Sequence, residues 1–281
     1  MRGSPEQGTS TPPRRVVGTD GDGVARASRL GRAIPVALVG FAGVGWAWSL
    51  VTARQMSPRA MGGQVAPDPM GMGSAAATAM SLTSFMVAWL AMMAAMMLPA
   101  IIPVVRLYGL AAARGAAAPV PVFVAGYLTV WGAVGLPASL AWRALGEPLA
   151  NGDAWVGYLA ATVLLAAAAY QLTPLKTACL RHCRSPLSFF LRQRGDLRRP
   201  RTALRMGMSH GLVCLGCCWA LMAILITLGT MQVGAMLSIA ALILLEKNAP
   251  QGVLIARTVP AVMAALGVAL LAHPSLISHL G

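Results

Sequence analysis

The chain has 281 residues, of which 57% are hydrophobic and only 11% are charged, and its mean hydropathy is +0.68. A soluble domain carries roughly 25% charged residues, so this composition excludes an ordinary water-soluble protein, a disordered chain and a small disulfide-stapled protein. We expect an all-α fold, a polytopic transmembrane helical bundle. The net charge of +14 then reflects basic residues kept on the cytoplasmic side rather than binding to nucleic acid.

The expected organisation is a tail followed by one membrane domain. Residues 1–32 are rich in Gly, Pro, Ser, Thr and Arg and predict a disordered basic tail, whereas residues 33–281 form the transmembrane domain. We predict seven spans, or six if the sixth segment does not cross, because that segment is shorter than the roughly 20 residues that a span needs. The apolar segments are 33–52, 78–98, 119–142, 154–172, 204–230, 232–246 and 252–272.

The distribution of basic residues predicts the orientation. With the N-terminus in the cytoplasm, most Lys and Arg residues fall on the cytoplasmic side, whereas the outer segments hold Arg54, Arg59 and Arg143. We therefore expect a multi-pass protein of the inner (plasma) membrane, with the lipid bilayer as its surroundings.

The fifth apolar segment carries a stripe of soft metal ligands. Its members lie at positions i, i+4, i+8, i+11 and i+12, which form one face of a helix. Thioether, imidazole and thiolate groups favour Cu(I) or Zn(II) over hard cations, and an imidazole within a span is costly and usually functional. The alternative is that small Cys and Gly residues permit close helix packing. The members are Met206, His210, Cys214, Cys217 and Cys218.

A second pair of thiols lies after the fourth segment. Pro174 should end or kink that helix, and Cys179 and Cys183 follow at a spacing that places them on one helical face, with His182 beside them. We expect this pair to be an exchange site at the inner mouth of the bundle. The alternative is a basic interfacial helix with incidental thiols.

The second apolar segment carries a methionine stripe. Met93 and Met97 lie near its inner end, at a depth that overlaps the depth of His210 and Cys214 if the two helices are neighbours. We expect these thioethers to add to the central site, although a methionine stripe is also typical of helix packing.

Two charged residues border the apolar segments. Glu246 ends the sixth segment, and its expected partner is Lys176, Lys247 or Arg257 in an interfacial salt bridge. For Lys176 the default expectation is that its ammonium group extends to the lipid headgroups.

The chain resembles a known bacterial family at this point, the "predicted metal-binding integral membrane protein" family, a domain of unknown function. The resemblance covers about residues 80–250 and implies a multi-span membrane fold with suspected metal binding. It rests on the run Met92-Met-Ala-Ala-Met-Met-Leu-Pro99, the loop TPLKxxCLxxCRxP at 173–186, and the CxGCCW element from Cys214 to Trp219 followed by Glu246-Lys247.

The function expected from these features is binding of a soft metal within the bundle, with Cu(I) favoured and zinc as the alternative. The role would be transport, storage or delivery, with a metallochaperone or a metalloenzyme as the protein partner. No Walker-type loop, GxSxG elbow or HExxH helix occurs, so we expect no enzyme activity. Two other functions stay open: a membrane thiol-disulfide oxidoreductase, and a structural membrane subunit without metal.

Overall fold

A computed structural model describes residues 33–47, 51, 81–151, 153–191, 196–228 and 233–273 of the chain. Within these ranges the secondary structure is helical and contains no strand, which confirms the all-α class. The expected tail, residues 1–32, and the cytoplasmic location of the N-terminus lie outside the described residues.

The observed helices follow the apolar segments of the sequence closely. The first described helix is Ala33–Ala47, and it packs through Gly45 against Ala95 and through Ile34 against Gly109. The labelled elements are α3 (Leu82–Met97), η2 (Pro99–Ile101), α4 (Ile102–Ala113), α5 (Val120–Asn151), α6 (Ala154–Gln171), α7 (Pro174–Arg184), α8 (Pro186–Leu191), α9 (Pro200–Leu228), α10 (Val233–Asn248) and α11 (Gly252–Ala272).

Proline and threonine explain where two helices break. Pro99 lies directly after α3, and α4 continues the apolar path at an angle of 41°. At the end of α6 the chain bends by 67°, because Pro174 opens a new helix and the Thr173 side chain caps it by accepting a hydrogen bond from the Lys176 N–H at 3.3 Å. The break that Pro174 predicts is therefore present.

Among the described residues, fewer helices pass as membrane spans than the six or seven that the sequence predicts. In the described ranges three helices are long and apolar enough to span, and there are up to five if each bent pair, α3 with α4 and α6 with α7, is one span. The expected six or seven spans are not confirmed, because the described helix Ala33–Ala47 and α10 are each shorter than the roughly 20 residues of a full crossing.

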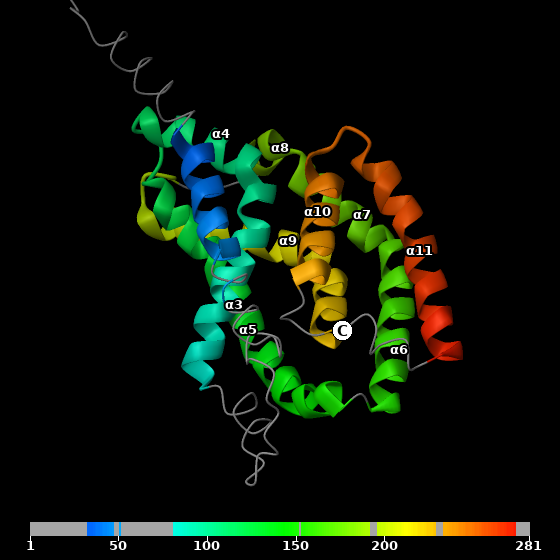
Figure 1. Ribbon diagram of the computed structural model, residues 1–281. Helices are drawn as coiled ribbons and strands as arrows, with labels where there is room; N and C mark the ends of the chain where they lie inside the picture. The colour runs from blue at the N-terminus through cyan, green and yellow to red at the C-terminus, as the bar shows by residue number, and fades with distance from the viewer. Residues whose placement is uncertain are drawn as a thin grey trace, which may run out of the picture.

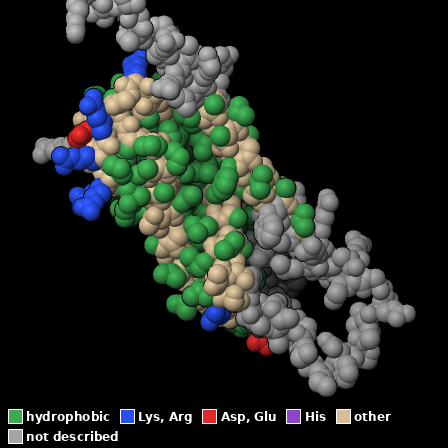
Figure 2. All heavy atoms as spheres, turned by 90° about the vertical axis from the view of Figure 1, so that its left-hand side faces the viewer, with side chains coloured by type: hydrophobic (Ala, Val, Ile, Leu, Met, Phe, Trp, Pro, Cys, Tyr) green, Lys and Arg blue, Asp and Glu red, His purple; other side chains and the backbone are tan. Residues whose placement is uncertain are grey.

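Helices α9 and α10 occupy the centre of the molecule, with α3, α4 and α5 on one side and the pair α6 and α11 on the other (Figure 1). The strongest helix contacts join α5 to α9 and α6 to α11, and α7 packs across α9. Figure 2 shows a flank covered mostly by hydrophobic side chains, with most of the visible Lys and Arg near the upper end and a further basic side chain near the lower end. This distribution is what a bilayer requires of a protein surface.

Glycines allow α5 and α9 to approach each other closely. A Cβ atom at Gly126 would overlap the Leu204 carbonyl, and a Cβ atom at Gly207 would overlap the Phe123 carbonyl. Small residues at a helix interface bring backbones together in this way. The close contact places Tyr127 of α5 directly against the cysteines of α9.

Candidate metal centre

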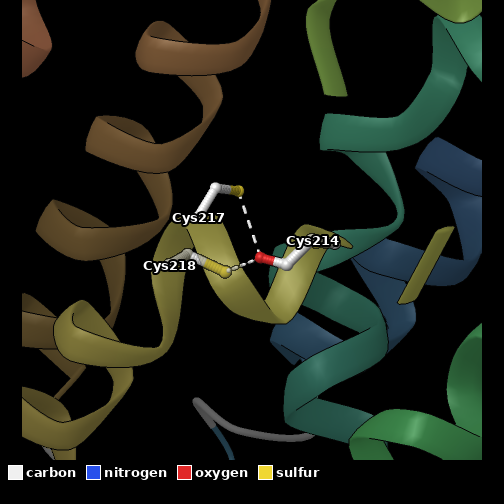
Figure 3. A group of neighbouring side chains, drawn as sticks. All are labelled: Cys214, Cys217 and Cys218. Carbon is white, nitrogen blue, oxygen red and sulfur yellow. Dashed lines mark hydrogen bonds between the residues drawn. The ribbon is translucent and has the colours of Figure 1, made fainter. Parts of the chain in front are cut away.

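The structure gathers three cysteine thiols inside the bundle on one segment of α9. Cys214, Cys217 and Cys218 are at most 2% exposed, and their sulfur atoms all lie within 4.8 Å of one another. Figure 3 shows the Cys217 and Cys218 thiols both directed at the Cys214 carbonyl oxygen, to which they donate at 3.1 and 3.0 Å. Because metal–sulfur bonds measure about 2.3 Å, sulfur atoms this close can share one ion after small side-chain rotations.

A fourth sulfur joins this cluster from α7. The Sγ atom of Cys183 lies 3.8 Å from that of Cys217. The side chain of Cys179, one turn earlier, packs on Gly216, where a Cβ atom would come within 2.8 Å of its sulfur. Both α7 cysteines are partly exposed, whereas the α9 cysteines are buried. The five thiols therefore lead from the protein surface to its interior.

The predicted stripe on α9 is the buried face of that helix. Met206 and His210 are each 1% exposed, like the cysteines that follow them. The His210 ring lies among Phe123, Tyr127 and Phe189, with centroid separations of 6.3, 6.0 and 4.9 Å. Its Nδ1 atom has no hydrogen-bond partner in the described part of the chain. Buried polar atoms are normally hydrogen-bonded, so this nitrogen needs an explanation. A bound metal ion would supply the missing partner.

Three other predicted ligands, Met93, Met97 and His182, come from α3 and α7. Met93 and Met97 are fully buried, but α3 packs mainly on α5, and it is α5 that packs on α9. The overlap in depth with His210 and Cys214 was conditional on α3 and α9 being neighbours, and the main contacts of α3 are with α5 instead. The His182 ring is partly exposed and its Nδ1 atom lies 3.0 Å from the Ala178 carbonyl oxygen, within its own helix.

Two residues next to Cys214 were not expected as site residues. Lys247, at the end of α10, donates a hydrogen bond from Nζ to the Cys214 sulfur at 2.9 Å. The Tyr127 hydroxyl lies 3.0 Å from the same sulfur. Both side chains are buried. The position of Lys247 directly after an apolar segment could have indicated a role for it. No feature of the sequence pointed to Tyr127.

Glu246 forms a buried ion pair with Lys176. The Lys176 Nζ atom donates to the two carboxylate oxygens at 2.9 and 2.8 Å, and both residues are at most 2% exposed. Lys176 was one of the three expected partners, but the ammonium group does not extend to the surface as predicted. The reason is that Thr173 and Pro174 start α7 at an angle that turns Lys176 inward toward α10. Arg184 adds a hydrogen bond to the Glu246 carbonyl oxygen at 2.6 Å.

Fold and site together define a helical protein with apolar spans and a buried cluster of soft ligands. The chain belongs to the PpoB2 family, whose model is described as a copper chaperone and matches residues 86–270. No curated protein and no solved structure matches the chain. The matched range includes all five cysteines, and the metal-related family and the buried thiols together support metal binding.

Proposed function

We propose that this protein is a multi-pass membrane protein that binds Cu(I) on the thiols of α9 and passes it on to a partner metalloprotein. The observation that carries the proposal is the buried cluster Cys214, Cys217 and Cys218, which Cys183 extends toward the surface of the molecule. The copper chaperone description of the family supports copper over zinc. Cu(I) is among the metals that soft thiolate and thioether ligands select.

Copper enters, in this proposal, from the cytoplasmic side of the plasma membrane. The supporting observation is the basic character of α7, whose last turn holds Arg181, His182 and Arg184, since basic residues are retained on that side. A Cu(I) ion held by Cys179 and Cys183 would move to Cys217 by ligand exchange, across the 3.8 Å that separates Cys183 from it. The protein acts as a binder and carrier of copper, with no catalytic step.

The imidazole of His210 and the thioethers of Met206, Met93 and Met97 extend the proposed pathway beyond the thiols. Each is a neutral soft or borderline ligand, and each is buried. His210 stands one helical turn before Cys214 on the same buried face of α9, so it would be available as a neutral ligand beside the thiols.

The direct test is the metal content of the detergent-purified full-length protein after exposure to Cu(I). We expect copper in the wild type and a loss of at least 90% of it in the Cys214→Ser/Cys217→Ser/Cys218→Ser variant. Elemental analysis of both, beside their thermal unfolding curves, separates a lost site from a lost fold. A folded triple variant that keeps full copper content would refute the proposal.

The two entry cysteines give a second test. We expect the Cys179→Ser/Cys183→Ser variant to bind copper with unchanged stoichiometry but to load it at least tenfold more slowly from a Cu(I)-loaded donor. The reason is that the transfer path is interrupted while the buried cluster is intact. Copper transfer is stopped at successive times and the copper in the protein is measured by elemental analysis. This gives both the loading rate and the final stoichiometry. If this variant loses all copper, the α7 thiols are part of the main site and the two-site arrangement is wrong.

A thiol-disulfide oxidoreductase is the second candidate, and the 3.8 Å separation of the Cys183 and Cys217 sulfur atoms favours it. Two thiols would release two protons and pass two electrons to an acceptor such as a quinone, with formation of one disulfide. A copper-free wild type in which quinone consumes two thiols per chain would support this function in place of the first.

A further inference from the structure

Lys247 is a buried cation without a carboxylate partner in the described part of the chain. The neighbouring carboxylate, Glu246, is held by Lys176 on both of its oxygens. Arg184, which is partly buried, directs its guanidinium at the carbonyl oxygens of Glu246 and Pro250. The contact that remains for the Lys247 ammonium is the Cys214 sulfur at 2.9 Å.

A buried ammonium group needs a negative charge nearby. Removing an ion from water costs several kcal/mol unless a partner compensates for it, and an ionisable residue inside a membrane segment is as a rule paired. Since the ion pair of Lys176 with Glu246 is neutral as a unit, the compensating charge for Lys247 has to come from the thiol cluster. Lys247 and the cysteines therefore form one electrostatic unit.

The charge of this unit limits how copper can be bound. Cu(I) bound by two thiolates has one negative charge, which the Lys247 ammonium neutralises. Cu(I) with three thiolates would leave an excess negative charge, and Cu(I) with one thiolate and neutral ligands would leave the ammonium uncompensated. In surroundings of low dielectric constant, either imbalance is strongly unfavourable.

We infer that Lys247 is the counter-ion of the copper complex and that it restricts the site to two thiolates per Cu(I), one of them Cys214. This inference rests on the proposed function and deepens it, because it assigns a composition to the complex and a role to a residue of α10. Lys247 is a positioning residue here: it contacts the ligand sulfur and does not bind the metal.

The experiment uses the full-length protein in detergent, loaded with Cu(I) alone. X-ray absorption at the copper edge should show two sulfur ligands per copper in the wild type. Lys247→Gln keeps an N–H donor near Cys214 but removes the charge, and it should lower the Cu(I) affinity at least tenfold in competition with a colorimetric Cu(I) chelator. Lys247→Arg, which keeps the charge, should restore most of that affinity.

Ile243→Val serves as the matched control for packing. Ile243 is buried one turn before Lys247 on α10, so its shortening disturbs the same helix without changing any charge, and the affinity should stay within threefold. Three sulfurs per copper that persist when Met93, Met97 and Met206 are replaced by leucine, or a Lys247→Gln variant with wild-type affinity, would overturn the inference while leaving copper binding intact. A wild type that takes up no copper would refute the proposed function itself. If Lys247→Gln does not fold, the sulfur count of the wild type still decides the inference.

Discussion

Replacing Cys214 by serine should weaken Cu(I) binding more than any other single change in the thiol cluster. We expect the affinity to fall at least tenfold, which corresponds to about 1.4 kcal/mol. Serine replaces a soft thiolate with a poor hydroxyl ligand, and it also removes the sulfur that both Lys247 and Tyr127 contact. Competition with a Cu(I) chelator, titrated against the purified variant, measures the change.

Trp219→Phe is the control for this substitution. Trp219 adjoins Cys218 but is 45% exposed, and it packs edge-on against Tyr170 rather than on the thiols. The variant should bind copper like the wild type. If Cys214→Ser keeps full affinity as well, the cysteines of α9 serve packing and the copper proposal fails.

The largest expected effect on stability comes from Gly207→Ala. A methyl group at this position would overlap the carbonyl oxygen of Phe123 and also lie within 3.0 Å of the Tyr127 backbone nitrogen. Backbone atoms of two packed helices cannot rotate away as a side chain can, so α5 and α9 have to separate. We expect a loss of about 3 kcal/mol, at the upper end of the range for overpacking. Thermal unfolding of the purified variant measures it.

Gly43→Ala is the matched change without a clash. Gly43 is exposed on Ala33–Ala47, and a Cβ atom there meets nothing within 4 Å. Its unfolding temperature should equal that of the wild type or rise slightly, because alanine favours a helix over glycine. Equal stability of the Gly207 and Gly43 variants would show that the close contact of α5 with α9 contributes little.

Local pattern predicted much of the helical structure. The boundaries of α6, α9 and α11 agree with the apolar segments to within a few residues, and Pro174 marks the bend between α6 and α7. The gathering of Cys214, Cys217 and Cys218 follows from helical spacing alone. These features depend on residues that are close in sequence, which is why they could be predicted from the local pattern.

Contacts between distant segments could not be predicted in the same way. Tyr127 and Lys247 reach Cys214 from 87 and 33 residues away. The position of Tyr127 depends on the glycines that bring α5 and α9 together, and that of Lys247 depends on how α10 packs against α9. The contribution of Met93 and Met97 was conditional on α3 and α9 being neighbours, and equal depth in the membrane does not tell which helices are neighbours. In the described residues the main contacts of α3 are with α5, and α5 in turn packs on α9.

The two adjacent residues Glu246 and Lys247 connect the partly exposed thiols of α7 with the buried thiol of Cys214. Glu246 binds α7, the helix with Cys179 and Cys183, through Lys176, whereas Lys247 binds Cys214 on α9. A movement of α7 away from the bundle has to break a buried ion pair or pull the end of α10 with it. In the second case the ammonium group would move away from Cys214. If the protein carries copper as proposed, exposing Cys179 and Cys183 would therefore also remove the contact between Lys247 and the Cys214 sulfur.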